Sequence, residues 1–170
     1  MHEIGLVPKK RISTINKHKK QLESELNVKI SISKEGELEI IGEGIELWTA
    51  KRVLTAIARG FEPETAVFLK ESEFGLEIIE VTDYATSKNS IMRLKGRIIG
   101  EKGYSKSKIE QLTGTYISVQ GKFVGIIGHF NNLDLARKAV TMLLEGRMHS
   151  TVFRFLEKER RRKKLKRGFI

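Results

Sequence analysis

The chain has 170 residues, of which 39% are hydrophobic and 31% charged, which suits one ordinary domain or two small ones. It has no cysteine, which excludes disulfides and thiolate zinc sites and fits a reducing, cytoplasmic compartment. No apolar run approaches the roughly 20 residues of a membrane span, and residues 1–10 lack the apolar core of a signal peptide. We therefore expect a cytoplasmic protein that does not engage membranes.

The net charge of +11 and the pI near 9.9 favour a polyanionic partner. Residues 154–167 contain nine Lys or Arg and two Glu, a net charge of +7, which leaves +4 for the rest of the chain. The excess charge therefore lies mostly in the tail. A charged tail alone fits a solvated appendage equally well, so the case for RNA must come from elsewhere.

The first third of the chain predicts a helix, two strands and a second helix. Apolar residues fall at helical spacing up to residue 26 and then alternate with polar residues over 28–32, as in a half-buried strand. Glu35-Gly36 predicts a turn into a strand at 38–41, and residues 46–59 carry an apolar helical stripe. The defining residues are Ile12, Ile15, Leu22, Leu26, Val28, Ile30, Ile32, Leu47, Ala50, Leu54 and Ile57. Residues 63–72, beginning with Pro63, are interpreted as a linker.

The remainder predicts a strand near 76–81, helices on both sides of residues 100–103, strands at 115–119 and 123–127, and a helix at 133–145. Residues 149–170 form a basic tail. We expect it to be partly helical from Thr151, docked by Phe153 and Phe155, and frayed at its end.

The chain repeats itself. Three segments recur 86 residues apart: 40–42 at 126–128, 50–52 at 136–138, and Gly60 at Gly146. Residues 28–32 align with 115–119 at an offset of 87. Because the register holds across a whole unit, we divide the chain into a first domain at 1–62, the linker at 63–72, a second domain at 73–148 and the tail at 149–170.

Residues 96–103 read Gly-Arg-Ile-Ile-Gly-Glu-Lys-Gly, between the two helices that open the second unit. Gly100 and Gly103 permit backbone angles closed to other residues and remove side chains from the approach path. Amide groups at the start of the next helix would then face a phosphate, with Lys102 at the tip. A GxxG alone is weak evidence, because most are ordinary turns.

The run IIGEKG, followed by IEQLTGTYISV, resembles the KH signature, and the element order resembles its type I arrangement. In KH domains the GxxG loop clamps about four nucleotides of single-stranded nucleic acid by their backbone. The resemblance implies that Gly100, Glu101, Lys102 and Gly103 form the clamp. Ile98 or Ile99 would floor the groove under the bases while the other packs in the core.

The same resemblance implies that Ile117 lines the far wall of the groove. Arg93, Lys95 and Arg97 would reach phosphates, although each is about equally well read as a solvated helix cation. Lys106 departs from the usual pattern, which has an apolar residue there, and would place a charge on the groove side of the helix.

With the tandem architecture, Lys106 and the segment 149–157, nearly the whole chain resembles the partner-of-NOB family, KH-repeat proteins of small-ribosomal-subunit assembly in archaea and eukaryotes. The family implies binding near the 3′ end of small-subunit ribosomal RNA. It also implies cooperation with the maturation endonuclease and a link to the alpha subunit of translation initiation factor 2.

The first unit departs from the KH pattern, because the offset of 87 places Ser13 and Asn16 where Gly100 and Gly103 stand. We interpret it as a degenerate KH domain in which these residues cap or turn a helix. Its basic run could act electrostatically or form a solvated face: Lys9, Lys10, Arg11, Lys17, Lys19 and Lys20. The predicted fold is α+β, with two tandem type I KH domains, each β-α-α-β-β-α with a three-stranded sheet, and a basic C-terminal helix.

We expect an RNA-binding monomer and not an enzyme, without metal or cofactor. The four histidines show no ligand spacing. Glu77 and Glu80 would face opposite sides of a regular strand, and no second acidic cluster completes a two-metal site. The alternatives are a KH-fold scaffold for protein interactions and a general RNA-binding factor in RNA processing. The intact Gly100–Gly103 loop favours RNA.

Overall fold

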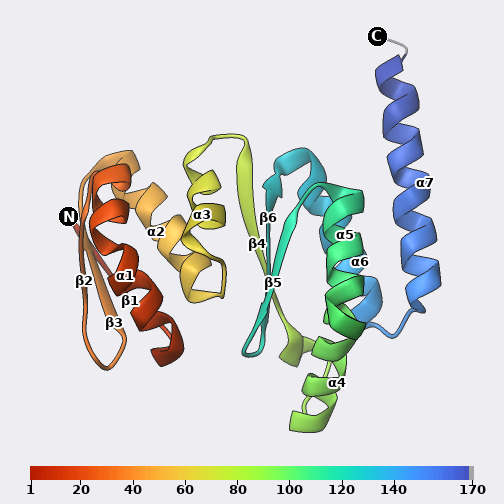
Figure 1. Cartoon of the computed structure of the whole chain (residues 1–170), viewed down its shortest axis with the longest axis horizontal. Helices are drawn as coiled ribbons and strands as arrows, with labels where there is room; N and C mark the ends of the chain where they lie inside the picture. Colours follow the sequence, from red (N-terminus) through yellow and green to blue (C-terminus); the bar gives the residue numbers. More distant parts are fainter. Residues whose placement is uncertain (169–170) are drawn as a thin grey trace. The chain divides into compact units, whose positions relative to one another are not determined.

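The structure is a computed structural model that describes residues 1–168 and divides into two compact units, Met1–Leu76 and Glu77–Ile170 (Figure 1). Each unit contains a three-stranded sheet with the same strand order, β1-β3-β2 in the first and β4-β6-β5 in the second. The last strand of each unit is therefore the central one. Within the described residues, every helix is too short or too polar to cross a membrane.

Unit 1 begins with the strand that the expected KH order implies, although no residue pattern located it in the sequence. Its elements are β1 (His2–Leu6), α1 (Lys9–Leu26), β2 (Lys29–Ile32), β3 (Glu37–Ile41), α2 (Gly44–Ala58), α3 (Pro63–Ala66) and the 3-10 helix η1 (Val67–Lys70). β3 pairs antiparallel with both β1 and β2. Ile15, Leu22 and Leu54 are at most 1% exposed, so α1 and α2 pack together over a shared core.

The expected β-α-α-β-β-α order is wrong for unit 1, because α1 is one continuous helix of 18 residues. Ser13 and Asn16 lie inside this helix and form neither a cap nor a turn. Ile15, between them, is fully buried. With no glycine to open the backbone and an anchored isoleucine at this point, the helix continues where a KH domain has a loop.

The segment expected to be a linker, residues 63–72, forms α3 and η1 and belongs to unit 1. Pro63 and Leu69 are buried. The Arg52 guanidinium on α2 donates to the carbonyl oxygens of Leu69 (3.4 Å) and Phe74 (2.8 Å). Burial lowers the pKa of Arg52, but a guanidinium remains charged, so it holds this segment against α2.

Unit 2 has the predicted β-α-α-β-β-α order and a basic C-terminal helix. Its elements are β4 (Phe74–Glu80), the 3-10 turn η2 (Val81–Asp83), α4 (Lys88–Ile99), the 3-10 turn η3 (Glu101–Gly103), α5 (Tyr104–Thr113), β5 (Tyr116–Gln120), β6 (Phe123–His129), α6 (Phe130–Leu144) and α7 (His149–Gly168). Helix α7 packs on α5 and α6 (Figure 1). Its anchors are Val152 and Leu156, both fully buried, whereas Phe153 and Phe155 are only half-buried.

The expected frayed tail is likewise wrong within the described residues. Helix α7 begins at His149 and continues to Gly168. The Lys163 ammonium donates to Asn131 O (2.9 Å) and Asn132 Oδ1 (3.0 Å) at the start of α6, and Glu159 pairs with Arg162. The Lys163 contacts hold the basic half of α7 against α6, and the Glu159–Arg162 pair supports the helix itself.

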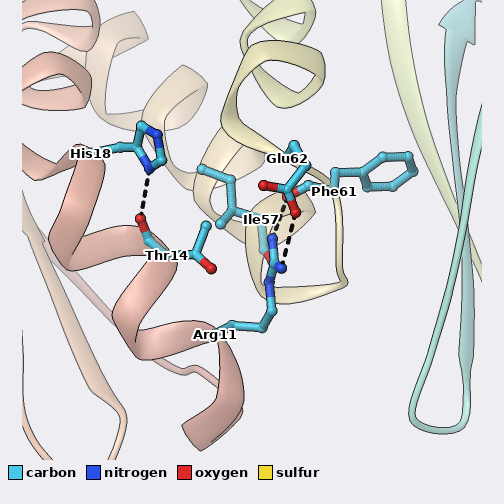
Figure 2. Close-up of polar contacts among 6 residues, drawn as sticks. All are labelled: Arg11, Thr14, His18, Ile57, Phe61 and Glu62. Carbon is cyan, nitrogen blue, oxygen red and sulfur yellow. Dashed lines mark hydrogen bonds and ion pairs between the residues drawn. The ribbon is translucent and has the colours of Figure 1, made fainter.

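An arginine clamps the end of the last large helix in unit 1 (Figure 2). Arg11 on α1 donates from Nε to Ile57 O (2.9 Å) and from Nη2 to Phe61 O (2.6 Å), and Nη1 pairs with Glu62 (3.2 Å). Carbonyls at a helix C-terminus lack partners in the helix and form the negative end of its dipole. The Arg11 guanidinium donates hydrogen bonds to carbonyls at this end and places a positive charge at the negative end of the dipole.

The clamp recurs in unit 2 at an offset of 86 residues. Arg97 donates from Nε to Leu143 O (3.2 Å) and from Nη2 to Arg147 O. The repeat therefore preserves the same guanidinium and the same two acceptor carbonyls.

A second contact recurs at an offset of 87. The Glu23 carboxylate accepts a bond from Ile30 N (2.8 Å), and that of Glu110 accepts one from Ile117 N (3.0 Å). Both tie a helix to the strand that follows it. Since the offset changes from 86 at the arginines to 87 at the glutamates, unit 2 has one extra residue between Arg97 and Glu110, the stretch that contains the glycine loop.

We predict that Arg11→Met lowers the free energy of unfolding by about 1.5–3 kcal/mol, because two carbonyls lose a charged donor. Lys10→Met is the matched control, since Lys10 is exposed. Urea unfolding of the full chain measures the effect. Equal midpoints for Arg11→Met and the control would show that the clamp contributes nothing.

Candidate nucleic-acid interface

The loop between α4 and α5 has a backbone that ordinary residues rarely adopt. Gly100, Lys102 and Gly103 have φ values of +73°, +52° and +78°. The two glycines carry no penalty for this conformation, whereas Lys102 is held in it by the turns on either side. The chain thus leaves α4, turns sharply and enters α5 within four residues.

Gly100 also lacks room for a side chain. A Cβ there would lie 2.6 Å from Ser105 Cβ and 2.8 Å from Ser105 N. At Gly103, by contrast, no described atom lies within 4 Å of an added Cβ. Gly100 therefore closes the loop against α5, and Gly103 leaves its outer side open.

The start of α5 is open to an anion. Within the described chain no side chain caps this helix, and its first turn contains no acidic residue. The N–H groups at a helix start lack intrahelical acceptors and carry the positive end of the dipole. Lys102 is exposed at the tip of the loop, beside the exposed Glu101. This geometry can accept a phosphate by backbone amides and one nearby cation.

The expected groove residues separate into surface and core. Ile99 is 36% exposed, but Ile98 is fully buried and Ile117 is 3% exposed. The expectation that one of the two neighbouring isoleucines belongs to the core thus describes Ile98. Ile117 does not line an open wall, because strand alternation points it into the core of unit 2.

The Lys and Arg side chains on α4 and α5 differ in whether they already have partners within the protein. Arg97 is engaged by the carbonyls at the end of α6, so the expectation that it reaches phosphate is not met. Lys106 pairs with Glu110 (3.3 Å), and both side chains are about one-quarter to one-third exposed. Arg93 is exposed and Lys95 half-buried, so these two remain available to a passing phosphate.

Helix α7 returns to the loop, which the sequence did not predict. The His149 ring hydrogen-bonds through Nε2 to Arg97 O (2.8 Å), near the end of α4. The Phe153 and Tyr104 rings meet edge-on at 6.2 Å. A hollow of about 710 Å³ lies here, lined by Gly100–Ser105, Ser107, His149 and Phe153. No local motif marks His149 as a neighbour of the loop; only the return of α7 brings it there.

The acidic residues considered for a nuclease are held in ion pairs. Glu80 lies 3.0 Å from Lys122 and Glu77 lies 3.9 Å from Arg137. Among residues 1–168, no three His, Asp or Glu side chains lie together as metal ligands would.

We predict opposite effects on stability for alanine substitutions at two neighbouring glycines, Gly100 and Gly96. Gly100→Ala should cost about 2 kcal/mol or more of unfolding free energy, from its left-handed backbone and its contact with Ser105. Gly96→Ala, inside α4 with open space around it, should be neutral or stabilising by about 0.5–1 kcal/mol. Chemical unfolding measures both. A tolerated Gly100→Ala would contradict the loop geometry.

Comparison with known proteins supports this reading of unit 2. Residues 75–161 match the PNO1 family model described as a eukaryotic type KH-domain (KH-domain type I). A KH domain-containing protein of Methanocaldococcus jannaschii is 42% identical over 98% of this chain and 76% of its own length. The RNA-binding protein pno-1 of Caenorhabditis elegans is 35% identical over 64% of this chain and 40% of its own.

A solved structure matches both units. It is a chain of the a/eIF2alpha-aDim2p-rRNA complex from Pyrococcus horikoshii, with a TM-score of 0.87, 35% identity, and coverage of 95% of this chain and 94% of that one. The family match covers the glycine loop and most of α7, and the relatives extend over unit 1. The chain therefore belongs to the PNO1-type KH-domain family.

Proposed function

We propose that unit 2 binds single-stranded RNA through residues 100–103, in the 3′ region of small-subunit ribosomal RNA during ribosome assembly. The observation that carries this is the open loop: an uncapped α5 whose first amides lie beside Gly103 and the exposed Lys102. Backbone amides of a GxxG loop bind the sugar-phosphate chain of about four nucleotides. Gly100, Glu101, Lys102, Gly103 and Ile99 form the proposed contact, with Arg93 and Lys95 beside it.

The rRNA assignment is supported by relatedness, since a structure with the same fold is of an aDim2p complex with rRNA and a/eIF2alpha. We extend both partners to this chain. Cooperation with the rRNA maturation endonuclease rests on the family resemblance alone. In this proposal the protein acts as a binding factor and not as an enzyme.

A scaffold that no longer binds RNA is the second candidate. Unit 1 favours that reading for itself, because α1 runs through the position of the loop. Its exposed Lys9, Lys10, Lys17 and Lys20 leave it an electrostatic contribution. A scaffold for protein interactions does not require a loop with exposed backbone amides and a nearby cation. We therefore assign RNA binding to unit 2.

The loop assignment predicts a loss of affinity in Glu101→Asp/Lys102→Asp. Replacing the tip cation by a carboxylate sets negative charge against phosphate, so affinity should fall roughly 10- to 100-fold. The matched control is Lys34→Asp/Glu35→Asp, which makes the same change of charge in the turn between β2 and β3. Filter binding to short single-stranded RNA measures both, with circular dichroism as the check on folding. A folded loop variant that binds like the control would overturn the assignment.

We also propose that the basic end of α7 contacts the RNA, which predicts a change in salt dependence when that end is removed. Lys158 and Arg161 are exposed on α7 beyond Glu157, and they would add phosphate contacts to those of the loop. With about 0.7 log units per phosphate on single strands, a loop touching roughly three phosphates gives a slope near −2, and the full chain should be steeper. A chain ending at Glu157 keeps the anchors Val152 and Leu156 and provides the comparison. Equal slopes for the two chains would mean that the end of α7 does not meet the RNA.

A further inference from the structure

We propose that the hollow between the glycine loop and the start of α7 holds the base of a nucleotide that flanks the segment clamped by the loop. This site lies outside the groove between the loop and β5, and it rests on the proposed RNA binding by unit 2. Residues 100–103 contribute to its wall. An RNA strand whose backbone passes over the loop therefore reaches the hollow within the next nucleotide.

The wall of the hollow contains an exposed aromatic ring. Tyr104 directly follows Gly103 and is 60% exposed. Phe153 meets it edge-on, with an interplanar angle of 84°, so Phe153 supports the ring without covering it. Aromatic side chains left open beside a nucleic-acid backbone site are the usual platforms for base stacking, because every base has a flat π-face.

A lysine that is itself paired with a glutamate helps to fix this platform. The Lys108 ammonium lies 5.7 Å from the centre of the Tyr104 ring and 5.0 Å from that of Phe153, and it donates to Tyr104 Oη at 3.4 Å. Glu157 on α7 lies 3.7 Å from the same ammonium. The Tyr104 ring is thus held in place by a cation that contacts its hydroxyl and that α7 holds through Glu157.

The hollow also contains a polar group that lacks a partner. Ser105 lines it and is 2% exposed, and no described residue hydrogen-bonds with its hydroxyl. A buried hydroxyl without a partner costs free energy. A base edge that reached this hydroxyl would supply the missing donor or acceptor.

The far wall is held in place. His149 is fixed by its bond to Arg97 O, and the Arg97 guanidinium is fixed in turn by the end of α6. The volume of about 710 Å³ falls in the range of pockets that hold small organic ligands. A rigid aromatic hollow of this kind favours one stacked base over a flexible peptide.

The test compares two RNAs on the full chain: one that fills only the groove, of about four nucleotides, and the same RNA extended at either end. Tyr104→Ala should leave the short RNA nearly unaffected and weaken one of the extended RNAs roughly 5- to 150-fold, the cost of one lost stack. Tyr104→Phe, which keeps the ring, should bind like wild type. Phe130→Ala is the matched control, because Phe130 is 58% exposed and lies outside the hollow.

A second measurement reports stacking directly. A fluorescent 2-aminopurine at the flanking position should be quenched by stacking when wild-type protein binds, and not when Tyr104→Ala binds. Unchanged affinity of Tyr104→Ala for both extended RNAs, or unquenched 2-aminopurine at both flanks, would overturn the proposal while RNA binding by the loop stands. Failure of wild type to bind any of these RNAs would instead overturn the proposed function.

Discussion

The close passage of Gly100 against Ser105 is the constraint on which unit 2 depends. A left-handed glycine whose missing side chain would stand 2.6 Å from Ser105 lets α4 end and α5 begin within four residues. Because the N-cap residue is Gly103, the first turn of α5 has no capping side chain. The same geometry that joins two helices thereby creates a site for an anion. The loop is thus a structural and a functional element at once.

The two units show how little separates such a site from an ordinary helix. They share the strand order, the arginine clamp on the last large helix and the glutamate bond to the next strand. Unit 2 has one more residue between the clamping arginine, Arg97, and the glutamate, Glu110, and two glycines lie within that stretch. Unit 1 has a buried isoleucine there, Ile15, and a single helix. Compared with unit 1, one additional residue and two glycines, Gly100 and Gly103, are thus enough to replace a continuous helix by an open turn.

Residue patterns in the sequence predicted the elements that depend on neighbouring residues. The alternation in β5, the helical stripes of α2 and α6, and the glycine loop of unit 2 were all visible in the sequence. Contacts between distant residues were not. From the sequence, Arg97 is expected to be a free cation, but in the fold it binds carbonyls at and just after the end of α6, about 50 residues away. Ile117 is expected to line the groove, but it is buried in the core. β1 is held by pairing with β3 and has no clear alternation of its own. Helix α3 looked like a linker because its burial depends on α2.

The most direct test of this account is the change in backbone amide resonances when single-stranded RNA is titrated into the full chain. If the loop binds phosphate through the start of α5, the largest shifts within unit 2 should fall on residues 100–105, with Gly96 on the preceding helix much less affected. Saturating RNA that shifts other residues of unit 2 but leaves the amides of 100–105 unmoved would contradict it.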